Sequence, residues 1–338
     1  MKILFYDIKK AELNYLLEKI SNDIEPYFFK NSINIQTYID EKFIDSEAVS
    51  AFVSSELNKD VLSQFKNLKY IFLRCVGYSN VDLEYCKENN IKVFNTPNYS
   101  NSTVAEYTFA LLLSLVKKIS NSQMAIKTGK ITQEELTGLE LHSKTIGVIG
   151  VGAIGRKVIN IAHGFGMDVL AYDIHQNGAY NFVELDELLK KSDFISINCP
   201  LNEYTRGLID RIAISKMKRN AIIINTARGE IIDTEALYYA LAEKKILGVA
   251  LDVVECEEYL CQNWKKCNEN SIIKTTCLKK FFFIQKLMQF SNVIVTPHNA
   301  YNTKEALDRI LKITLENIQS AIVLEKNPKC SAKNLVLI

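Results

Sequence analysis

The sequence predicts an α/β protein built from two doubly wound parallel-sheet domains with a cleft between them. Short apolar runs alternate with amphipathic segments along all 338 residues, which is typical of strands joined by crossover helices. These runs fall into two series, one on each side of about residue 98. Continuous apolar runs such as Ile222-Ile223-Ile224 are typical of strands that are buried on both faces of a sheet.

The first series predicts one sheet-containing domain. Its strands are expected at residues 2–6, 51–54, 70–74 and 91–95. Helical patterns lie between them, at residues 61–65 and 82–89. The series breaks near Pro97-Asn98-Tyr99-Ser100, just before a helix expected over about residues 102–120.

The second series predicts a larger sheet. Its strands are expected at residues 145–150, 169–173, 194–198, 221–225, 248–252 and 293–296, with helices at 185–191 and 234–244 among the crossovers. The last helix begins near Asn302, a possible N-cap that is followed three residues later by Glu305. Residues 259–290 fit no element well, and we interpret them as a long loop with one helix.

Composition excludes several classes of protein. The 41 Lys and Arg residues nearly balance the 39 Asp and Glu residues, which argues against a nucleic-acid partner. Apolar residues make up 48% of the chain, which is typical of a globular protein, and the longest apolar stretches are too short to span a bilayer. The chain begins with a strand pattern instead of a signal peptide, so we expect a cytoplasmic protein.

The cysteines predict reduced thiols. Four of the eight, Cys256, Cys261, Cys267 and Cys277, lie close together, but no pair has the short C-x2-C spacing of a zinc site. Reduced thiols are the usual state in the cytosol. We therefore expect no metal and keep a metal site as the alternative.

A glycine-rich turn stands where a dinucleotide site requires one. Gly150-Val151-Gly152-Ala153-Ile154-Gly155 directly follows an expected strand and opens a helix. Gly150 permits the tight turn, Gly152 lets the backbone approach a pyrophosphate, and Gly155 lets the helix pack close to the strand. The phosphates then meet free N–H groups at the helix N-terminus.

An acidic residue follows this motif at the expected distance. Asp173 ends the next strand, 18 residues after Gly155, where a carboxylate accepts the ribose hydroxyls of NAD and repels the 2′-phosphate of NADP. The sequence therefore predicts NAD as the cofactor. A tight turn with a helix-capping Asp, or an S-adenosylmethionine site, would share part of this pattern.

Three polar residues follow buried strands of the second series. Arg228 comes after the strand at 221–225, Glu257 lies beyond the strand at 248–252, and His298 follows the strand at 293–296. The carboxyl ends of parallel strands meet at the ligand crevice of an open α/β sheet. Because the preceding Ile run sets its depth, we do not expect Arg228 to be a solvated surface charge. A histidine at a strand end can also be purely structural.

At this point the chain resembles the D-2-hydroxyacid dehydrogenase family, and within it the NAD-dependent D-lactate dehydrogenases. The resemblance covers nearly the whole chain. Its motifs are Arg74-Cys75-Val76-Gly77 with Val81-Asp82, Pro97-Asn98-Tyr99-Ser100 with Val104-Ala105-Glu106, the glycine motif, Asn225-Thr226-Ala227-Arg228-Gly229, Leu251-Asp252-Val253 and Thr296-Pro297-His298. The last three of these motifs, in this order, are highly specific to the family.

The resemblance implies a division of the chain. A flavodoxin-like substrate domain would comprise residues 1–98 plus 303–338, because the final helix crosses back to the first domain in this family. A Rossmann NAD-binding domain would comprise residues 99–302. The family is usually dimeric through the nucleotide-binding domain, so a homodimer is expected.

The resemblance also implies the site residues. Arg228, Glu257 and His298 would form the catalytic triad, with Asp252 near the nicotinamide amide. Cofactor contacts are expected from Gly150, Gly152, Ala153, Ile154, Gly155, Asp173, Cys199, Pro200, Thr226, Ala227, Arg228, Asp252 and His298. Substrate contacts are expected from Arg74, Cys75, Val76, Gly77, Tyr99, Arg228, His298 and Tyr301, although either tyrosine could serve in packing alone.

Several positions depart from the family pattern. The serine that usually follows Arg74 is Cys75 here, and Glu257 is followed by Glu258 where the family often has proline. Glu255 is therefore a nearby rival for the catalytic acid. Ser54 stands where lactate-type members generally have an aromatic residue, so we hypothesise a pocket that accepts 2-oxoacids larger than pyruvate.

These residues predict an NADH-dependent reductase of a small 2-oxoacid, most simply pyruvate to D-lactate in fermentation. His298 would act as general acid and base, because imidazole titrates near the working pH. A reductase for a bulkier acid such as 2-oxoisocaproate is an alternative within the family. An NAD-sensing binding protein without enzymatic activity is an alternative of another class. A phosphoglycerate-type dehydrogenase is less favoured, because extra cationic residues near Arg74 and a regulatory tail are lacking.

Overall fold

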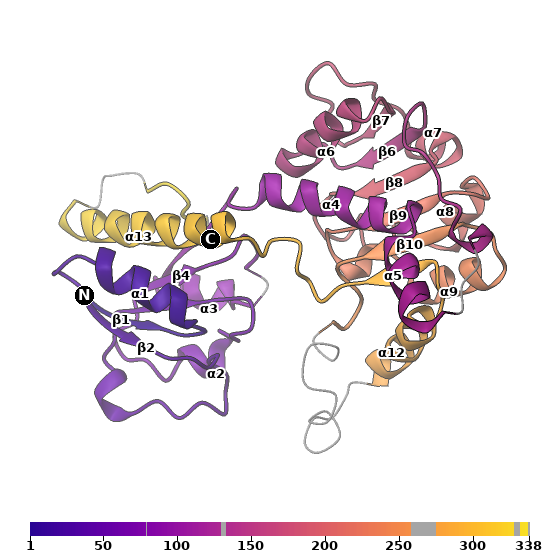
Figure 1. The fold of residues 1–338 in the computed structure, drawn as a ribbon. Coiled ribbons are helices and arrows are strands. Elements are labelled where there is room, and N and C mark those ends of the chain that lie inside the picture. Colours follow the sequence, from indigo (N-terminus) through magenta and orange to yellow (C-terminus); the bar gives the residue numbers. More distant parts are fainter. Residues whose placement is uncertain (79, 130–132, 258–274, 328–331, 337–338) are drawn as a thin grey trace. The chain divides into compact units, whose positions relative to one another are not determined.

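The computed structural model describes residues 1–78, 80–129, 133–257, 275–327 and 332–336. The chain forms two compact units. Unit 1 comprises Met1–Tyr99 and Thr303–Ile338, and unit 2 comprises Ser100–Asn302, which places the division one residue from the expected boundary. Each unit contains one parallel sheet with helices on both faces (Figure 1). The predicted α/β fold class is confirmed.

The sheet of unit 1 has five parallel strands in the order β2-β1-β3-β4-β5. They are β1 (Lys2–Phe5), β2 (Glu25–Phe28), β3 (Ala48–Ala51), β4 (Tyr70–Leu73) and β5 (Lys92–Phe94). The edge strand β2 was not predicted, because its residues Glu-Pro-Tyr-Phe form no apolar run. Its proline is tolerated because β2 lies at the edge of the sheet. The expected strand at 51–54 begins three residues earlier, at Ala48.

Helices cover both faces of this sheet. The helices α1 (Lys10–Lys19) and α13 (Lys304–Lys326) bury apolar residues on one face, and α2 (Lys59–Leu62) and α3 (Leu83–Glu88) lie on the other. The cap of α13 is Thr303 and not Asn302, because the Thr303 hydroxyl accepts the Ala306 N–H at 3.3 Å. The final helix therefore belongs to the first sheet, although it comes last in the sequence.

The sheet of unit 2 has six parallel strands in the order β11-β10-β9-β8-β6-β7. They are β6 (Thr145–Ile149), β7 (Asp168–Tyr172), β8 (Phe194–Ile197), β9 (Ile222–Asn225), β10 (Gly248–Leu251) and β11 (Val293–Val295). Each end lies within one residue of its prediction. An isolated parallel bridge from Ala171 to Phe182 lies beyond β7, where a Rossmann sheet carries a further strand.

The helices of unit 2 divide between the two faces of the sheet. They are α4 (Asn101–Val116), α5 (Ile119–Thr128), α6 (Ala153–Gly164), α7 (Leu185–Lys191), α8 (Arg211–Lys216), α9 (Thr234–Ala242) and α12 (Thr275–Leu287). The helices α4 and α6 share one core with the strands, and α7, α8, α9 and α12 share the other. The helix expected at 102–120 is broken, because Lys118 adopts a left-handed conformation with φ of 50°.

Two further outcomes concern the described residues. The helix predicted within 259–290 is α12, whereas residues 258–274 of the expected loop lie outside the described part of the chain. Within the described ranges, no helix combines the length and the apolar character needed to cross a membrane.

Candidate active site

The predicted polar residues lie at one edge of the second sheet. The strands β9, β10 and β11 are neighbours and run parallel, so the segments that follow them begin at the same edge. These segments carry Arg228, Glu257 and His298, respectively. The strand order therefore places three residues from distant parts of the sequence at one end of one sheet.

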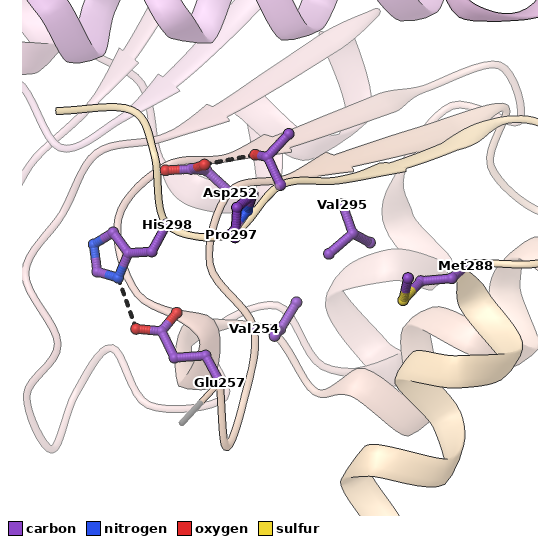
Figure 2. Close-up of a pocket in the computed structure, with 8 residues that line it drawn as sticks. Asp252, Val254, Glu257, Met288, Val295, Pro297 and His298 are labelled. Atoms are coloured by element: carbon purple, nitrogen blue, oxygen red, sulfur yellow. Dashed lines mark hydrogen bonds and ion pairs between the residues drawn. The ribbon is translucent and has the colours of Figure 1, made fainter. Parts of the chain in front are cut away.

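An acid–base pair forms at this edge. The Nδ1 atom of His298 lies 2.7 Å from Oε1 of Glu257, and each side chain is about one-third exposed (Figure 2). The other ring nitrogen of His298, Nε2, faces away from the carboxylate. The second oxygen of Glu257, Oε2, is buried and has no hydrogen-bond partner among the described residues. A carboxylate that is hydrogen-bonded to Nδ1 holds the imidazole ring in one orientation.

The rival acid points elsewhere. Glu255 Oε2 accepts the N–H and the hydroxyl of Thr234 at the start of α9, and it lies 3.0 Å from the Lys280 ammonium. Of the two acids that the sequence left open, Glu257 is therefore the one that contacts His298.

Asp252 fixes the turn that carries the histidine. Its side chain is 1% exposed, and it accepts hydrogen bonds from the Thr296 hydroxyl and from the N–H groups of Asn299 and Ala300. The Asp252 carbonyl also accepts the N–H of His298, whose φ is 49°. Both carboxylate oxygens of Asp252 are thus bonded within the protein, and they hold an otherwise unfavourable backbone conformation in place.

Arg228 is exposed, so the expectation that strand depth would remove it from solvent is wrong. Its Nη1 donates to the Ala227 carbonyl at 2.6 Å. The buried Asn225 side chain holds the loop from inside, because it donates to the Arg228 carbonyl and accepts the Ala227 N–H. A Cβ on Gly229 would lie 2.0 Å from the Val254 carbonyl carbon, so this loop lies directly against the segment that leads to Glu257.

The glycine turn has the geometry of a dinucleotide cradle. Gly150 has φ of 89°, and a Cβ there would lie 2.6 Å from the Cys199 nitrogen. A Cβ on Gly155 would lie 2.0 Å from the Gly150 carbonyl oxygen, whereas nothing lies within 4 Å of one on Gly152. The Asp173 carboxylate accepts the N–H of Val151 at 2.6 Å. Open space at Gly152 and an acid fixed at the turn fit the pyrophosphate and ribose of NAD.

The comparisons with known proteins agree with this geometry. Residues 109–300 match the family described as D-isomer specific 2-hydroxyacid dehydrogenase, NAD binding domain. The chain belongs to the D-2-hydroxyacid dehydrogenase family. It is therefore an NAD-dependent oxidoreductase that transfers hydride to or from a 2-hydroxyacid carbon, which confirms the predicted cofactor and reaction class.

Relatives of this dehydrogenase act on different acids. The chain is 34% identical to D-lactate dehydrogenase of Escherichia coli, with 98% of each chain covered. It is 38% identical to an aromatic 2-oxoacid reductase of Clostridium sporogenes, over 81% of this chain and 82% of the relative. The structure of D-lactate dehydrogenase from Aquifex aeolicus complexed with NAD and lactic acid matches with a TM-score of 0.85 and 35% identity, over 99% of this chain and 98% of that one.

A cavity of about 160 Å³ adjoins the acid–base pair of this dehydrogenase. The side chains of Glu257 and His298 stand at one end of it, and Val254, Val295 and Met288 form an apolar wall at the other (Figure 2). Asp252, Thr296 and Pro297 complete the lining. Sequence reasoning did not single out Met288, because a methionine near a helix end carries no functional signal.

The remaining cofactor candidates follow β8 and β9 or begin α6. Burial raises the pKa of the Cys199 thiol to about 11, so this residue is a neutral packing group. The Pro200 carbonyl accepts the Thr205 hydroxyl at 2.6 Å, and the Thr226 hydroxyl lies 3.1 Å from that of Thr108 on α4. Ala153 and Ile154 begin α6, where backbone N–H groups are available to a phosphate.

The substrate-loop candidates lie mainly in unit 1. Arg74 is 1% exposed, and its guanidinium donates to the Tyr6 and Asp7 carbonyls and to Ser50, so it is turned into the protein and not towards an open site. Burial also lowers the pKa of Arg74. The Cys75 thiol lies 3.1 Å from the Gly77 carbonyl oxygen. Arg74 therefore anchors the start of the 74–77 loop through hydrogen bonds within unit 1.

The other candidates of that set differ in exposure. Val76 is 44% exposed, whereas Tyr99 is buried in unit 1 and its carbonyl accepts the Arg309 side chain. Tyr301 lies in unit 2, with its ring centroid 6.4 Å from that of His298. Ser54 donates its hydroxyl to Asp7 at 2.7 Å, so it is tied to the first βα turn.

One covalent feature differs from the prediction. Cys256 and Cys277 form a disulfide, so the expectation of reduced thiols is wrong for this pair. The pair is separated by 21 residues along the chain, which no short-spacing rule detects, and folding brings the two Cα atoms within 5.8 Å. Three other cysteines, Cys75, Cys86 and Cys199, are buried and form no disulfide within the described residues, whereas Cys261, Cys267 and Cys330 lie outside them. The described residues contain no group of three or more His, Cys, Asp or Glu suited to a metal.

Proposed function

We propose that this dehydrogenase reduces a small 2-oxoacid, principally pyruvate to D-lactate, and that Arg228, Glu257 and His298 are its catalytic triad. The observation that carries the proposal is the 2.7 Å contact between Glu257 and His298, beside the ends of β10 and β11. Similarity to a D-lactate dehydrogenase over 98% of both chains supports the choice of pyruvate.

We assign the cofactor contacts to unit 2 and further substrate contacts to the loop of unit 1. The Gly150 turn and the start of α6 would hold the pyrophosphate, and Asp173 would accept the ribose hydroxyls. When bound, NADH supplies the hydride that reduces the keto carbon. Backbone N–H groups near Val76 and Gly77 would complete the site for the substrate carboxylate.

The proton comes from the protein. As the keto carbon is reduced, negative charge grows on its oxygen, and the protonated His298 gives up its Nε2 proton to form the hydroxyl group. Glu257, at hydrogen-bonding distance from Nδ1, orients the ring for this transfer. Arg228, whose planar guanidinium suits bidentate contacts, would bind the substrate carboxylate.

Loss of NADH absorbance after addition of pyruvate tests the proposal directly. His298→Ala is expected to lower kcat by ~10²- to 10⁴-fold, the usual contribution of a general acid, while the Kd of NADH stays nearly unchanged. The matched control is His163→Ala, because His163 is exposed on α6 and is expected to leave both quantities unchanged. Full activity of the His298 variant would refute the role of His298 as acid. A wild-type protein that binds NADH and turns over no 2-oxoacid would favour an NAD-sensing role.

A bulkier substrate is the second candidate. The apolar wall of Val254, Val295 and Met288 and the similarity to an aromatic 2-oxoacid reductase favour it. A comparison of kcat/KM for pyruvate, 2-oxobutyrate and 2-oxo-4-methylpentanoate decides between the two, with chiral analysis of the product. One methylene is worth ~1–3 kcal/mol in an apolar pocket, so a steep preference for pyruvate would exclude the bulkier acids.

We also propose a homodimer formed through unit 2. Helix α5 exposes apolar side chains, with Ile119 at 56%, Met124 at 55% and Ile126 at 87% exposure. An exposed apolar cluster of this kind is typical of an interaction surface, and a second copy of the chain is the expected partner. Light scattering that gives the mass of one chain would contradict this.

We place the enzyme in the cytoplasm, where the reaction would regenerate NAD⁺ during fermentation. The assignment is supported by the cofactor, because fermentation oxidises NADH in the cytoplasm. Fractionation of the source cells tests it, and activity found only outside the cytoplasm would refute it.

A further inference from the structure

The turn that carries Glu257 contacts the start of α9, helix α12 and His298. We call residues 255–257 the acid turn. Glu255 bonds to Thr234 and pairs with Lys280 of α12, Cys256 is joined covalently to Cys277 of α12, and Glu257 faces His298. Two of these four contacts run to the same helix, so α12 helps to position the turn.

Helix α12 is itself fixed on unit 2 by contacts that do not involve the disulfide. Its Ile284 and Leu287 are at most 1% exposed within the core, and Phe283 packs on Tyr238 with ring centroids 5.3 Å apart. Lys279 pairs with Glu235 of α9 at 2.6 Å. The helix therefore remains a firm support whether or not Cys277 is bonded to Cys256.

The backbone of the acid turn depends on its neighbours for its conformation. Cys256 has φ of 56°, a left-handed conformation that is unfavourable for a residue with a side chain. The disulfide attaches this strained residue directly to α12. Without the covalent bond, the Glu255–Lys280 ion pair is the contact that still links the turn to that helix, and the Lys280 side chain is 29% exposed. Partly exposed ion pairs are weak.

We propose that the Cys256–Cys277 disulfide positions Glu257 against His298, so that its reduction lowers turnover. This inference rests on the proposed function. Disulfides that occur in the cytosol are usually catalytic or redox-sensing, which fits a bond placed one residue from a catalytic acid.

The redox step is a thiol–disulfide exchange with a dithiol. A thiolate of the dithiol attacks one sulfur, the S–S bond breaks, and the released thiolate takes up a proton. The second thiol of the reagent then attacks the mixed disulfide, which leaves Cys256 and Cys277 as thiols and the dithiol as its disulfide. Two electrons pass to the protein, and a low-molecular-weight disulfide reverses the change.

The test compares oxidised and dithiothreitol-reduced wild-type enzyme in the pyruvate assay. Differential alkylation with mass spectrometry measures the cross-link between Cys256 and Cys277. We expect reduction to lower kcat about tenfold, below the ~10²- to 10⁴-fold loss on removing a general acid outright, with the Kd of NADH unchanged.

Variants separate positioning from general loosening of the fold. Cys277→Ser, which leaves the acid turn unaltered in sequence, is expected to match the reduced wild-type enzyme and to ignore dithiothreitol. The control Cys261→Ser/Cys267→Ser/Cys330→Ser is expected to keep the full redox response. In Glu257→Gln, reduction is expected to have no further effect on kcat, because the carboxylate to be positioned is already gone.

Each outcome bears on a specific claim. Absence of the Cys256–Cys277 cross-link in the oxidised protein, or equal kcat in the two redox states, overturns the inference while the proposed function stands. A redox effect in Glu257→Gln equal to that in the wild-type enzyme also overturns it. An oxidised, cross-linked protein without activity on any 2-oxoacid overturns the proposed function instead.

Discussion

The first five strands have the same order in the two units, but the turn that follows the first strand differs between them. In each sheet, the first and third strands of the unit are neighbours, which creates a crevice beyond their carboxyl ends. In unit 2, Gly150 stands there with φ of 89° and lies directly against the Cys199 backbone. In unit 1, the turn after β1 contains Asp7, with φ of 58°. Its carboxylate accepts the Phe52 N–H and the hydroxyls of Ser54 and Ser55.

Strand topology creates a crevice in each unit, but the side chains at the turn determine what occupies it. In unit 2 the turn has no side chain at Gly150, and no side chain in the described part of the chain caps the start of α6, so the first N–H groups of that helix suit an external anion. In unit 1 the protein supplies its own anion, Asp7, and the buried Arg74 guanidinium donates to the Tyr6 and Asp7 carbonyls nearby. The first crevice is therefore closed by internal hydrogen bonds, and the second is suited to a dinucleotide.

The largest effect is expected from Gly150→Ala. A methyl group there would lie 2.6 Å from the Cys199 nitrogen, at a φ that alanine rarely adopts. The left-handed conformation alone costs about 1–2 kcal/mol, and the clash with the backbone adds to it. We expect the free energy of unfolding in urea to fall by more than ~2 kcal/mol, and NADH affinity to fall with it.

Gly152→Ala is the matched control, since nothing lies within 4 Å of a Cβ at that position. It is expected to leave the urea midpoint almost unchanged and to weaken NADH alone. If both variants lose stability equally, the distinction between a tight turn and an open cradle is mistaken.

An intermediate effect is expected from Asp7→Asn. Asparagine tolerates the left-handed backbone, so the substitution removes the charge without new strain. The three donors that face the carboxylate then meet an amide, and a hydrogen bond to a charged group is worth ~1.5–3 kcal/mol. We expect unfolding to become easier by ~1–3 kcal/mol, with the Kd of NADH unchanged in a fluorescence titration. Loss of NADH binding comparable to that of Gly150→Ala would show that the two crevices are not independent.

The smallest effect is expected from Ser54→Ala. Ser54 is exposed, so water can replace its hydrogen bond to Asp7, and the free energy of unfolding should change by less than ~1 kcal/mol. Ser55→Ala is the comparison, because Ser55 is fully buried and its hydroxyl also accepts the Ile33 N–H at 3.1 Å. Equal losses in the two variants, measured by thermal unfolding, would contradict this account of the closed crevice.

Local sequence patterns were sufficient to predict most of the secondary structure of unit 2. Each of its strands is an apolar run bounded by turn residues, so its ends were predicted within one residue. The glycine motif and Asp173 were predicted by their spacing, because the motif and the βα turn are adjacent in the chain. The edge strand β2 was missed, because its pairing partner, and not its own composition, makes it a strand.

Contacts between residues that are distant in the sequence were decided by tertiary packing. Sequence distance cannot tell whether Glu255 or Glu257 meets His298, since the choice depends on which way each side chain leaves the acid turn. The Cys256–Cys277 bond likewise arises because α12 packs against α9 and brings Cys277 beside the turn. Neighbouring residues largely determine the helices and strands, whereas contacts between distant segments form because burial of the apolar core brings those segments together.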